Sequence, residues 1–468
     1  MSPTRGRFWW DLLRKQVAVA PEESAADEVD HGPLVVFATR VAAVALQTGA
    51  SSSEATEMLL RLGFAQGVRL NVDITYTAVT VTAPETDAHP PRVGRRTVPA
   101  LGWDYARLAH LEDVVDRFCA GELTLAEATG EVRRRGTTGP VYRRWVVAGA
   151  AFAQGASICA LLGGVPLEII LAGLATLGID LAVAWLGRRN VTYFFCQVVA
   201  GAIPMAIAMG LMVLRNHGVH ELWSLSPSLV VASGMVSMLA GLGIVGAAQD
   251  ALDGAYLTAT ARAVDVAMRT GGLILGVVGM LWLGVRLGLP AYLAPDPLPA
   301  PHPLVQVVSA AAFSLVFAVG AKLGPRGALL AGGLGGLLWT GYLLALPITG
   351  GDHAVAAGLA SLGIAFAARL LARWGRLPAI ALTTLGIAPL MPGMILYRGL
   401  YRLTVGMPAV QPGDDAGALF LLAALTGVFL ALGSSIGGML GRQVVLPRER
   451  AARLAAVLSR RRSQWRQA

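Results

Sequence analysis

Charged side chains are scarce in this sequence of 468 residues. Asp, Glu, Lys and Arg together make up 14% of the chain, whereas hydrophobic residues make up 55%. An average soluble domain has about 25% charged residues. The mean hydropathy of +0.59 agrees with this imbalance. The shortage of charge excludes an ordinary soluble protein over most of the length and predicts a polytopic α-helical membrane protein.

Cysteine is also rare, and its three positions do not have the spacing of metal ligands. Cys159 and Cys196 lie within apolar runs, and Cys119 lies in a more polar part of the chain. We interpret all three as small core residues. We expect no metal and no cofactor.

The net charge of +9 raises the question of nucleic-acid binding. The arginines, however, cluster beside apolar runs, where basic residues set the orientation of membrane spans. We therefore expect a lipid environment and no nucleic-acid partner.

The first 140 residues have the pattern of a soluble domain after a tail at 1–33. Residues 34–46 are predicted to form a helix, and Ser51 with Glu54 forms a capping box that begins another. Residues 70–76 then alternate with period two, followed by a Thr-rich run at 79–81 that also predicts a strand. We interpret 85–96, with its adjacent prolines, as an exposed loop.

Two more helices are predicted before the membrane part. One begins at Asp104, and the other begins at Thr124, whose capping partner is Glu127. The acidic stretch 110–116 could indicate an enzyme, but no nucleophile motif or phosphate loop accompanies it. We predict a cytoplasmic α+β domain over 34–140 without enzymatic activity, with a membrane-anchored hydrolase as the alternative.

Ten apolar runs of membrane-spanning length follow. Five lie in 141–289 and five in 304–441, with a Pro-rich linker at 290–303 and a basic tail at 442–468. The runs lie near residues 146–163, 165–186, 191–214, 228–247, 264–287, 304–323, 327–346, 353–371, 378–397 and 416–441.

Basic residues flank alternate ends of these runs, which places both termini in the cytoplasm. An odd number of spans in each half makes the second half begin on the opposite side of the membrane. If the halves are repeats, they are two inverted five-helix repeats, the architecture of many secondary transporters.

The stretch 378–400 reads PAIALTTLGIAPLMPGMILYRGL. Pro389 and Pro392 lack the amide proton that an unbroken helix needs, and Gly393 permits close approach of other backbone. Freed carbonyls in a bilayer must face protein or a watery cavity. We predict a broken span on a substrate path; a kink that only shapes packing is the alternative.

Several motifs resemble those of the bacterial threonine/serine exporter family. The similarity includes QTGASSSEATEMLLRLGFAQGV at 47–68, GELTLAEA at 121–128 and APLMPGMILYRGL at 388–400. Asp250, Gly254 and Arg262 match the spacing of the family's Asp, Gly and Arg. Two positions depart from the family's pattern. Where the family has a Pro-Gly pair in its first membrane half, this sequence has Ala240 and Gly241. Where the family often has an Asn before the Asp, this sequence has Gly246.

The resemblance implies export of threonine and serine through the bacterial plasma membrane, driven by protons or another coupling ion. Split relatives are associated with dicarboxylate export, so a dicarboxylate exporter is an alternative, and a passive channel or receptor is another. Whether the chain assembles into a homo-oligomer is left open.

Candidate functional residues follow from these patterns. Asp180 lies inside a predicted span, where a carboxylate is costly, so it is either a coupling group or a partner of Arg188 or Arg189. Polar side chains in spans can face a zwitterion or simply bond neighbouring helices. The predicted substrate path comprises Pro389, Pro392, Gly393, Thr383, Thr384, Tyr397, Gly241 and Gln197, and the predicted coupling or gating groups are Asp180, Asp250 and Arg262.

Overall fold

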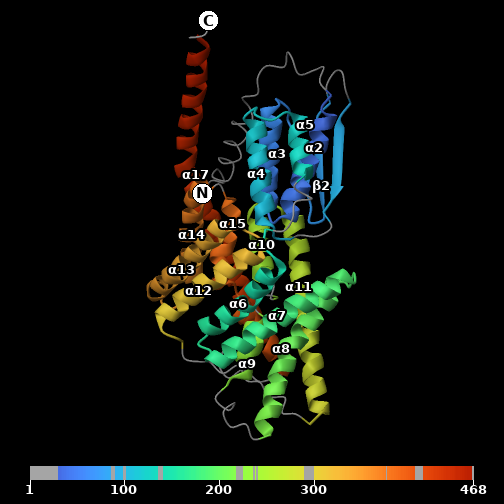
Figure 1. Cartoon of the computed structure of the whole chain (residues 1–468), viewed down its shortest axis with the longest axis vertical. Coiled ribbons are helices and arrows are strands. Elements are labelled where there is room, and N and C mark those ends of the chain that lie inside the picture. The colour runs from blue at the N-terminus through green and yellow to red at the C-terminus, as the bar shows by residue number, and fades with distance from the viewer. Residues whose placement is uncertain are drawn as a thin grey trace, which may run out of the picture. The chain divides into compact units, whose positions relative to one another are not determined.

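The structure is a computed structural model that divides into two compact units, Met1–Gly139 and Pro140–Ala468 (Figure 1). It describes residues 30–85, 90–98, 102–134, 141–217, 225–235, 238, 241–288, 300–375, 377–405 and 415–465.

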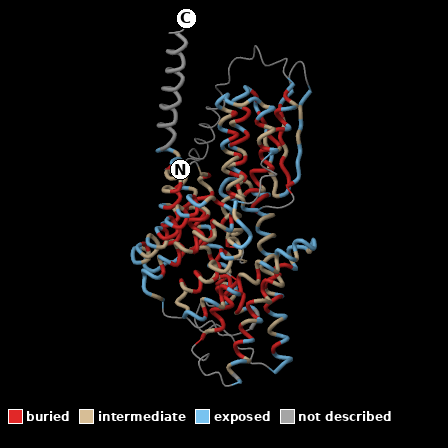
Figure 2. The backbone as a smooth tube through the Cα atoms, viewed as in Figure 1, coloured by how far each residue is buried: buried red, intermediate tan, exposed pale blue. Residues whose placement is uncertain are grey.

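The described residues of the first unit form a three-stranded sheet and four helices. The strands β1 (Asn71–Ile74), β2 (Ala78–Ala83) and β3 (Arg92–Thr97) form an antiparallel sheet in the order β1-β2-β3. The helices are α2 (Gly32–Gln47), α3 (Ser52–Ala65), α4 (Tyr105–Cys119) and α5 (Leu125–Arg134). The α2 helix contacts β2, β3 and each of the other three helices. It is mostly apolar and is buried along most of its length, which makes it the centre of this unit (Figure 2).

Both predicted helix starts are confirmed, and the one at Thr124 has both bonds of its capping box. The backbone amide of Glu54 donates to Ser51 Oγ at 3.2 Å, so α3 begins where its sequence predicts. The backbone amide of Thr124 donates to the carboxylate of Glu127 at 2.8 Å, and the amide of Glu127 donates back to Thr124 Oγ1 at 3.3 Å. These reciprocal bonds use amides that would otherwise lack partners at a helix start.

The prediction of a loop over the whole of 85–96 is wrong for its second part. Residues Arg92–Thr97 form β3, which pairs with β2 over six residue pairs. The strand lies at the edge of the sheet and is largely exposed, so it has no apolar face to reveal it in the sequence. Residues 86–89 lie outside the described residues.

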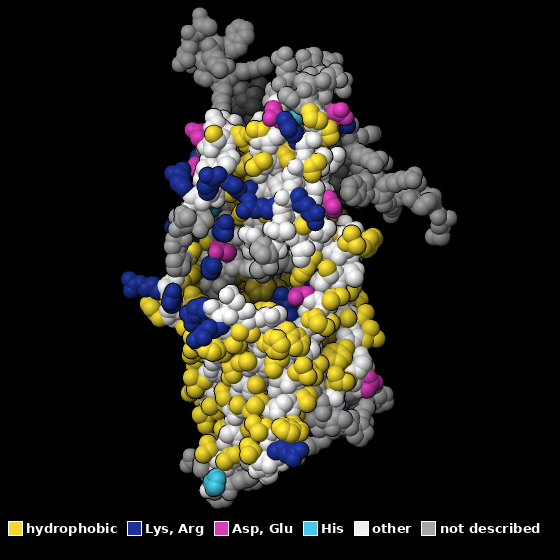
Figure 3. All heavy atoms as spheres, turned by 90° about the vertical axis from the view of Figure 1, so that its right-hand side faces the viewer, with side chains coloured by type: hydrophobic (Ala, Val, Ile, Leu, Met, Phe, Trp, Pro, Cys, Tyr) yellow, Lys and Arg dark blue, Asp and Glu magenta, His cyan; other side chains and the backbone are white. Residues whose placement is uncertain are grey.

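The second unit is helical and has the composition of a membrane protein. Among the residues that the structure describes, eight helices of this unit are long and apolar enough to span a bilayer, and a bent pair of helices makes a ninth candidate. Hydrophobic side chains cover much of its surface, as Figure 3 shows. The helices are α6 (Arg144–Leu161), α7 (Pro166–Arg188), α8 (Tyr193–Asn216), α9 (Pro227–Met235), α10 (Gly241–Leu252), α11 (Tyr256–Arg286), α12 (Pro303–Gly320), α13 (Pro325–Ile348), α14 (His353–Gly375), α15 (Ala379–Ile387), η2 (Ala388–Leu390), α16 (Gly393–Val405) and α17 (Ala416–Trp465).

The predicted count of ten spans therefore needs one qualification. The expected fourth span at 228–247 corresponds to two short helices, α9 and α10, of nine and 12 residues. Residues 236–237 and 239–240 between them lie outside the described residues. Each of the other nine expected spans corresponds to one of the candidates above, and α17 continues beyond its span into the basic tail.

Helices in the two halves have matching neighbours. In the first half α6 packs on α7, α8 packs on α11, and α9 contacts both α7 and α8. In the second half α12 packs on α13, α14 packs on α17, and α15 contacts both α13 and α14. The halves meet where α6 packs on α12 and where α10 packs on α17.

Glycines allow the closest of these helix contacts. A Cβ atom added at Gly276 of α11 would lie 2.1 Å from the carbonyl oxygen of Val198 on α8. One added at Gly437 of α17 would lie 2.1 Å from the carbonyl oxygen of Leu362 on α14. Neighbouring backbones approach this closely only where no side chain intervenes. The pairs α8–α11 and α14–α17 are therefore specified by small residues.

Candidate functional site

A break in the second half divides α15 and η2 from α16. The two parts of the broken helix are bent by 47°. Met391 adopts an extended backbone, with φ −59° and ψ 141°, and the amide of Gly393 donates to the Met391 carbonyl at 2.7 Å. Pro389 and Pro392 carry no amide proton, so neither continues the helical hydrogen bonding. The predicted interruption of this span is confirmed.

Gly241, the first residue of α10, lies against this break. A Cβ atom added there would lie 3.0 Å from Met391 Cβ and 3.7 Å from Pro392 Cδ. Gly241 and Pro392 are both buried. Gly241 and the 389–393 segment, which both belong to the predicted substrate path, are therefore neighbours in the structure.

Two helix N-termini meet at this point. The α10 helix begins at Gly241, and α16 begins at Gly393, two residues after Met391. Helix N-termini carry partial positive charge and amides without helical partners. Together with proline-interrupted backbone, this arrangement can bind a carboxylate through amides and an ammonium through carbonyls.

Polar side chains flank the break along the same chain. Thr383 and Thr384 are half-buried on α15, ahead of the break. Tyr397 lies one turn into α16, and 2% of its side chain is exposed. Its hydroxyl has no hydrogen-bond partner among the described residues, although it packs in an apolar cluster with Met235 and Leu273. A buried hydroxyl without a partner is costly, which makes Tyr397 a candidate to bind a polar ligand or water.

Gln197 belongs to a different contact. It lies on α8 with 1% of its surface exposed, and its Cβ would be 2.8 Å from a Cβ added at Gly272 of α11. Its side-chain carbonyl has no hydrogen-bond partner in the part of the chain that the structure describes. The structure therefore places Gln197 in the α8–α11 contact.

The other end of α10 carries an ion pair. Arg262 Nε of α11 lies 3.0 Å from Asp250 Oδ2, and these side chains are 22% and 3% exposed. A Cβ atom at Gly246 would lie 2.5 Å from a terminal nitrogen of Arg262, so this glycine leaves room for the guanidinium. Asp250 comes nine residues after Gly241, about 13 Å along a helix. The pair joins α10 to α11 at a distance from the break.

Asp180 stands apart from both groups. It is half-buried within α7. The alternative in which it pairs with Arg188 or Arg189 is not observed, since none of the ion pairs among described residues includes Asp180. The Arg189 guanidinium instead lies 5.2 Å from the ring centre of Trp185.

Two polar contacts were not predicted as functional. Gln249 Nε2 of α10 donates to Ser434 Oγ of α17 at 2.9 Å, next to Asp250, and so joins the two halves. Glu168 is 2% exposed and accepts from the backbone amides of Val165, at 2.8 Å, and of Ser226. Its place three residues after Val165, the N-cap of α7, is a capping signal that could have been recognised.

The fold and the broken helix define a multi-pass helical membrane protein. The family model described as "Putative threonine/serine exporter" matches residues 36–284, and the model described as "Threonine/Serine exporter, ThrE" matches residues 304–439. The chain therefore belongs to the threonine/serine exporter family.

Two curated relatives agree with this assignment. The chain is 29% identical over 419 residues to the "Probable threonine/serine exporter" of Mycobacterium tuberculosis, covering 88% of this chain and 76% of the relative. It is 28% identical over 393 residues to the "Threonine/serine exporter" of Corynebacterium glutamicum, covering 80% and 77% respectively. No solved structure matches the chain.

Proposed function

We propose that this protein exports threonine and serine across the plasma membrane by alternating access, driven by a proton or other ion gradient. The names of the two curated relatives support the substrate class. The observation that carries the proposal is the apposition of Gly241 with the break at Met391 and Pro392. Interrupted helices deep in a membrane are where secondary transporters hold their substrates.

In this proposal the two halves are inverted repeats. The matching neighbours of α6–α11 and α12–α17 support this relation, because each helix has its counterpart in the same order. The fourth element of each half is then interrupted, α9 with α10 in the first and α15 with α16 in the second. The basic residues at alternate span ends support cytoplasmic termini.

The substrate's two charges suit different atoms of the site. Its carboxylate would accept from amides at the starts of α10 and α16, and its ammonium would donate to backbone carbonyls of the segment that Pro389 and Pro392 interrupt. Hydroxyls of Thr383, Thr384 or Tyr397 would then bond the polar parts of the substrate. A site with paired polar groups rejects analogues that lack them.

Coupling is assigned to Asp180 and gating to the Asp250–Arg262 pair. Asp180 lies within α7 without an ion-pair partner among the described residues, so a proton can neutralise it. Asp180→Asn should abolish gradient-driven transport and leave substrate exchange intact. Uptake that still responds to the pH gradient in this variant would remove Asp180 from the mechanism.

Counterflow in proteoliposomes tests the transport proposal. Vesicles loaded with unlabelled threonine should accumulate labelled threonine, and external serine should compete, whereas succinate should not. Competition by succinate alone would instead favour the dicarboxylate alternative. Flux that follows only the substrate gradient, without counterflow, would favour a passive channel.

Gly241→Leu tests the position of the site. A leucine there would enter the space beside Met391, since even a Cβ reaches within 3.0 Å of Met391 Cβ. We expect loss of counterflow by at least about tenfold, because small misplacements at a binding site have effects of this size or larger. Gly279→Leu, where an added Cβ meets no atom within 4 Å, is the matched control and should transport normally. Normal counterflow by Gly241→Leu would place the site elsewhere.

A further inference from the structure

Four arginines line one pocket in the first unit, whereas the transport site proposed above belongs to the second unit. Its volume is about 240 Å³, and its apolar floor includes Val44 and Val132. Each arginine comes from a different element, namely Arg40 from α2, Arg96 from β3, Arg107 from α4 and Arg133 from α5.

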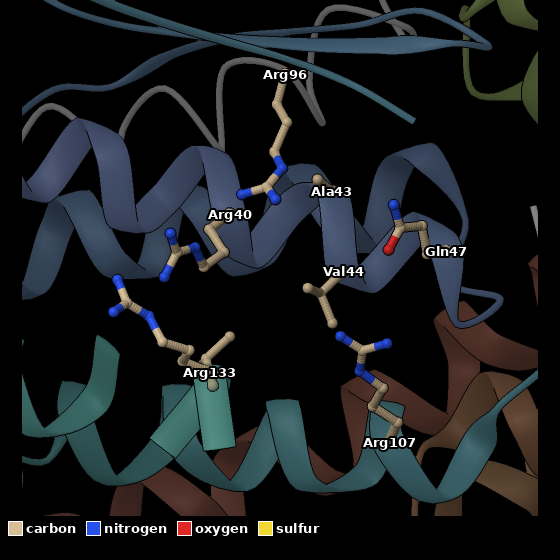
Figure 4. A pocket seen from close by; sticks show the side chains of 8 residues that line it. Arg40, Ala43, Val44, Gln47, Arg96, Arg107 and Arg133 are labelled. Carbon is tan, nitrogen blue, oxygen red and sulfur yellow. The ribbon is translucent and has the colours of Figure 1, made fainter. Parts of the chain in front are cut away.

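The arginine side chains are turned toward the pocket in Figure 4. The guanidinium groups of Arg40, Arg96 and Arg133 gather at one end, and that of Arg107 reaches toward Val44 at the other. Burial, followed by the charges of Arg133 and Arg96, lowers the pKa of Arg40, as expected for like charges close together.

No carboxylate neutralises this group among the described residues. Other arginines of the same unit do have acidic partners, since Arg92 pairs with Asp30 and Arg117 with Glu131. The four pocket arginines take part in none of the observed ion pairs. Guanidinium groups remain charged at neutral pH, so the pocket concentrates positive charge without a matching negative charge.

We propose that this pocket binds a small polyanion with at least two oxyanion groups, of the diphosphate or tricarboxylate type. Guanidinium forks match the geometry of phosphate and carboxylate oxygens and bond them bidentately. The pocket is smaller than the roughly 300 Å³ at which sites for drug-sized ligands begin, so a compact anion fits it better than a whole dinucleotide. Such a ligand would join α2, β3, α4 and α5 through one set of charges.

The chain itself contains a competing source of carboxylates. Glu22, Glu23, Asp27 and Glu28 lie in the N-terminal segment. A test must therefore separate a bound metabolite from these side chains.

Calorimetric titration of the full-length protein in an uncharged detergent tests the proposal directly and does not depend on transport. The probes are diphosphate and citrate, with the monoanion acetate as the control, all at one ionic strength because screening alters charge-dependent binding. We expect saturable binding of diphosphate or citrate at one site per chain and no binding of acetate. The probe with the higher affinity shows whether the pocket prefers phosphate or carboxylate groups.

Two adjacent arginines of β3 provide a matched comparison. Arg96 lines the pocket, and Arg95 does not. Successive side chains of a strand point to opposite faces, so Arg95→Gln removes the same charge without altering the pocket. Arg96→Gln should weaken binding about tenfold or more, the effect of losing a charge-assisted bond, and Arg95→Gln should leave it unchanged. Arg133→Gln is a second pocket variant should Arg96→Gln fail to fold.

Three results would overturn the proposal. The first is equal weakening by Arg95→Gln and the pocket variants, which would show attraction to a basic surface alone. The second is no binding of either polyanion to the natural chain or to a variant with Glu22, Glu23, Asp27 and Glu28 neutralised. The third is binding only after that neutralisation, which would show that the chain's own carboxylates occupy the pocket.

Discussion

At the scale of single residues, glycines decide where charged and polar groups can meet. Gly246 leaves space for the guanidinium of Arg262, which lies beside Asp250. A Cβ atom there would lie 2.5 Å from a terminal nitrogen of Arg262, so a larger side chain at this position requires the guanidinium to move.

The Asp250–Arg262 pair gives a prediction at the same scale. Asp250→Asn should lower stability by about 3 kcal/mol, since removing one partner leaves the other charge poorly compensated. The thermal unfolding midpoint of the full-length protein in detergent measures this. In the double variant with Arg262→Gln, part of the loss should be recovered because no lone charge remains. If the stability losses of the two single variants simply add in the double variant, the pair contributes no coupling energy.

At the scale of elements, the break between α15 and α16 follows from the missing amide protons of Pro389 and Pro392. Pro392→Ala supplies an amide proton at the break and removes a penalty of about 3 kcal/mol against continuous helix. We expect slower counterflow in this variant because the moving segment becomes stiffer. Circular dichroism and the elution volume should remain those of the natural protein. An unchanged or higher initial rate would show that the break is only a kink.

Helix packing at the α14–α17 contact gives a second prediction for an element. Gly437→Leu should lower stability by about 1 to 3 kcal/mol, the usual effect of forcing extra atoms into a packed contact. Gly438→Leu is the matched control, since a Cβ there meets no atom within 4 Å, whereas one at Gly437 lies 2.1 Å from the Leu362 carbonyl oxygen. Thermal unfolding of both variants in detergent provides the measurement. Equal stability would contradict this account of the contact.

At the scale of the whole membrane unit, the two halves touch where their fourth elements are interrupted. Cysteines at positions 241 and 391, with Cys119, Cys159 and Cys196 replaced, should form a disulfide under mild oxidation. The geometry favours this bond, because a Cβ at Gly241 lies 3.0 Å from Met391 Cβ and disulfides join Cβ atoms about 4 Å apart. A mass shift after labelling of free thiols measures its formation.

The same crosslink tests movement between the halves. Counterflow should stop when the disulfide forms and return when a reductant is added, because alternating access requires the halves to move relative to each other. Each single-cysteine variant serves as a control and should be insensitive to oxidation. Full transport by the crosslinked protein would exclude relative motion at this point.

Local signals in the sequence determined much of the fold. Capping boxes at Ser51 and Thr124 predicted two helix starts, because their hydrogen bonds connect residues only three positions apart. Apolar length predicted nine of the candidate spans, and the missing amide protons of Pro389 and Pro392 predicted the broken helix. Each of these features depends on chemistry within one or two turns of the chain.

Only the tertiary structure decided which distant residues meet. The polar strand β3 forms because β2 offers it hydrogen-bonding groups, so its own side chains contain little signal. Gln249 reaches Ser434 across 185 positions, and Arg40, Arg96, Arg107 and Arg133 gather from four separate elements. Such contacts follow from how packed elements are placed in space, and neither periodicity nor composition encodes that placement.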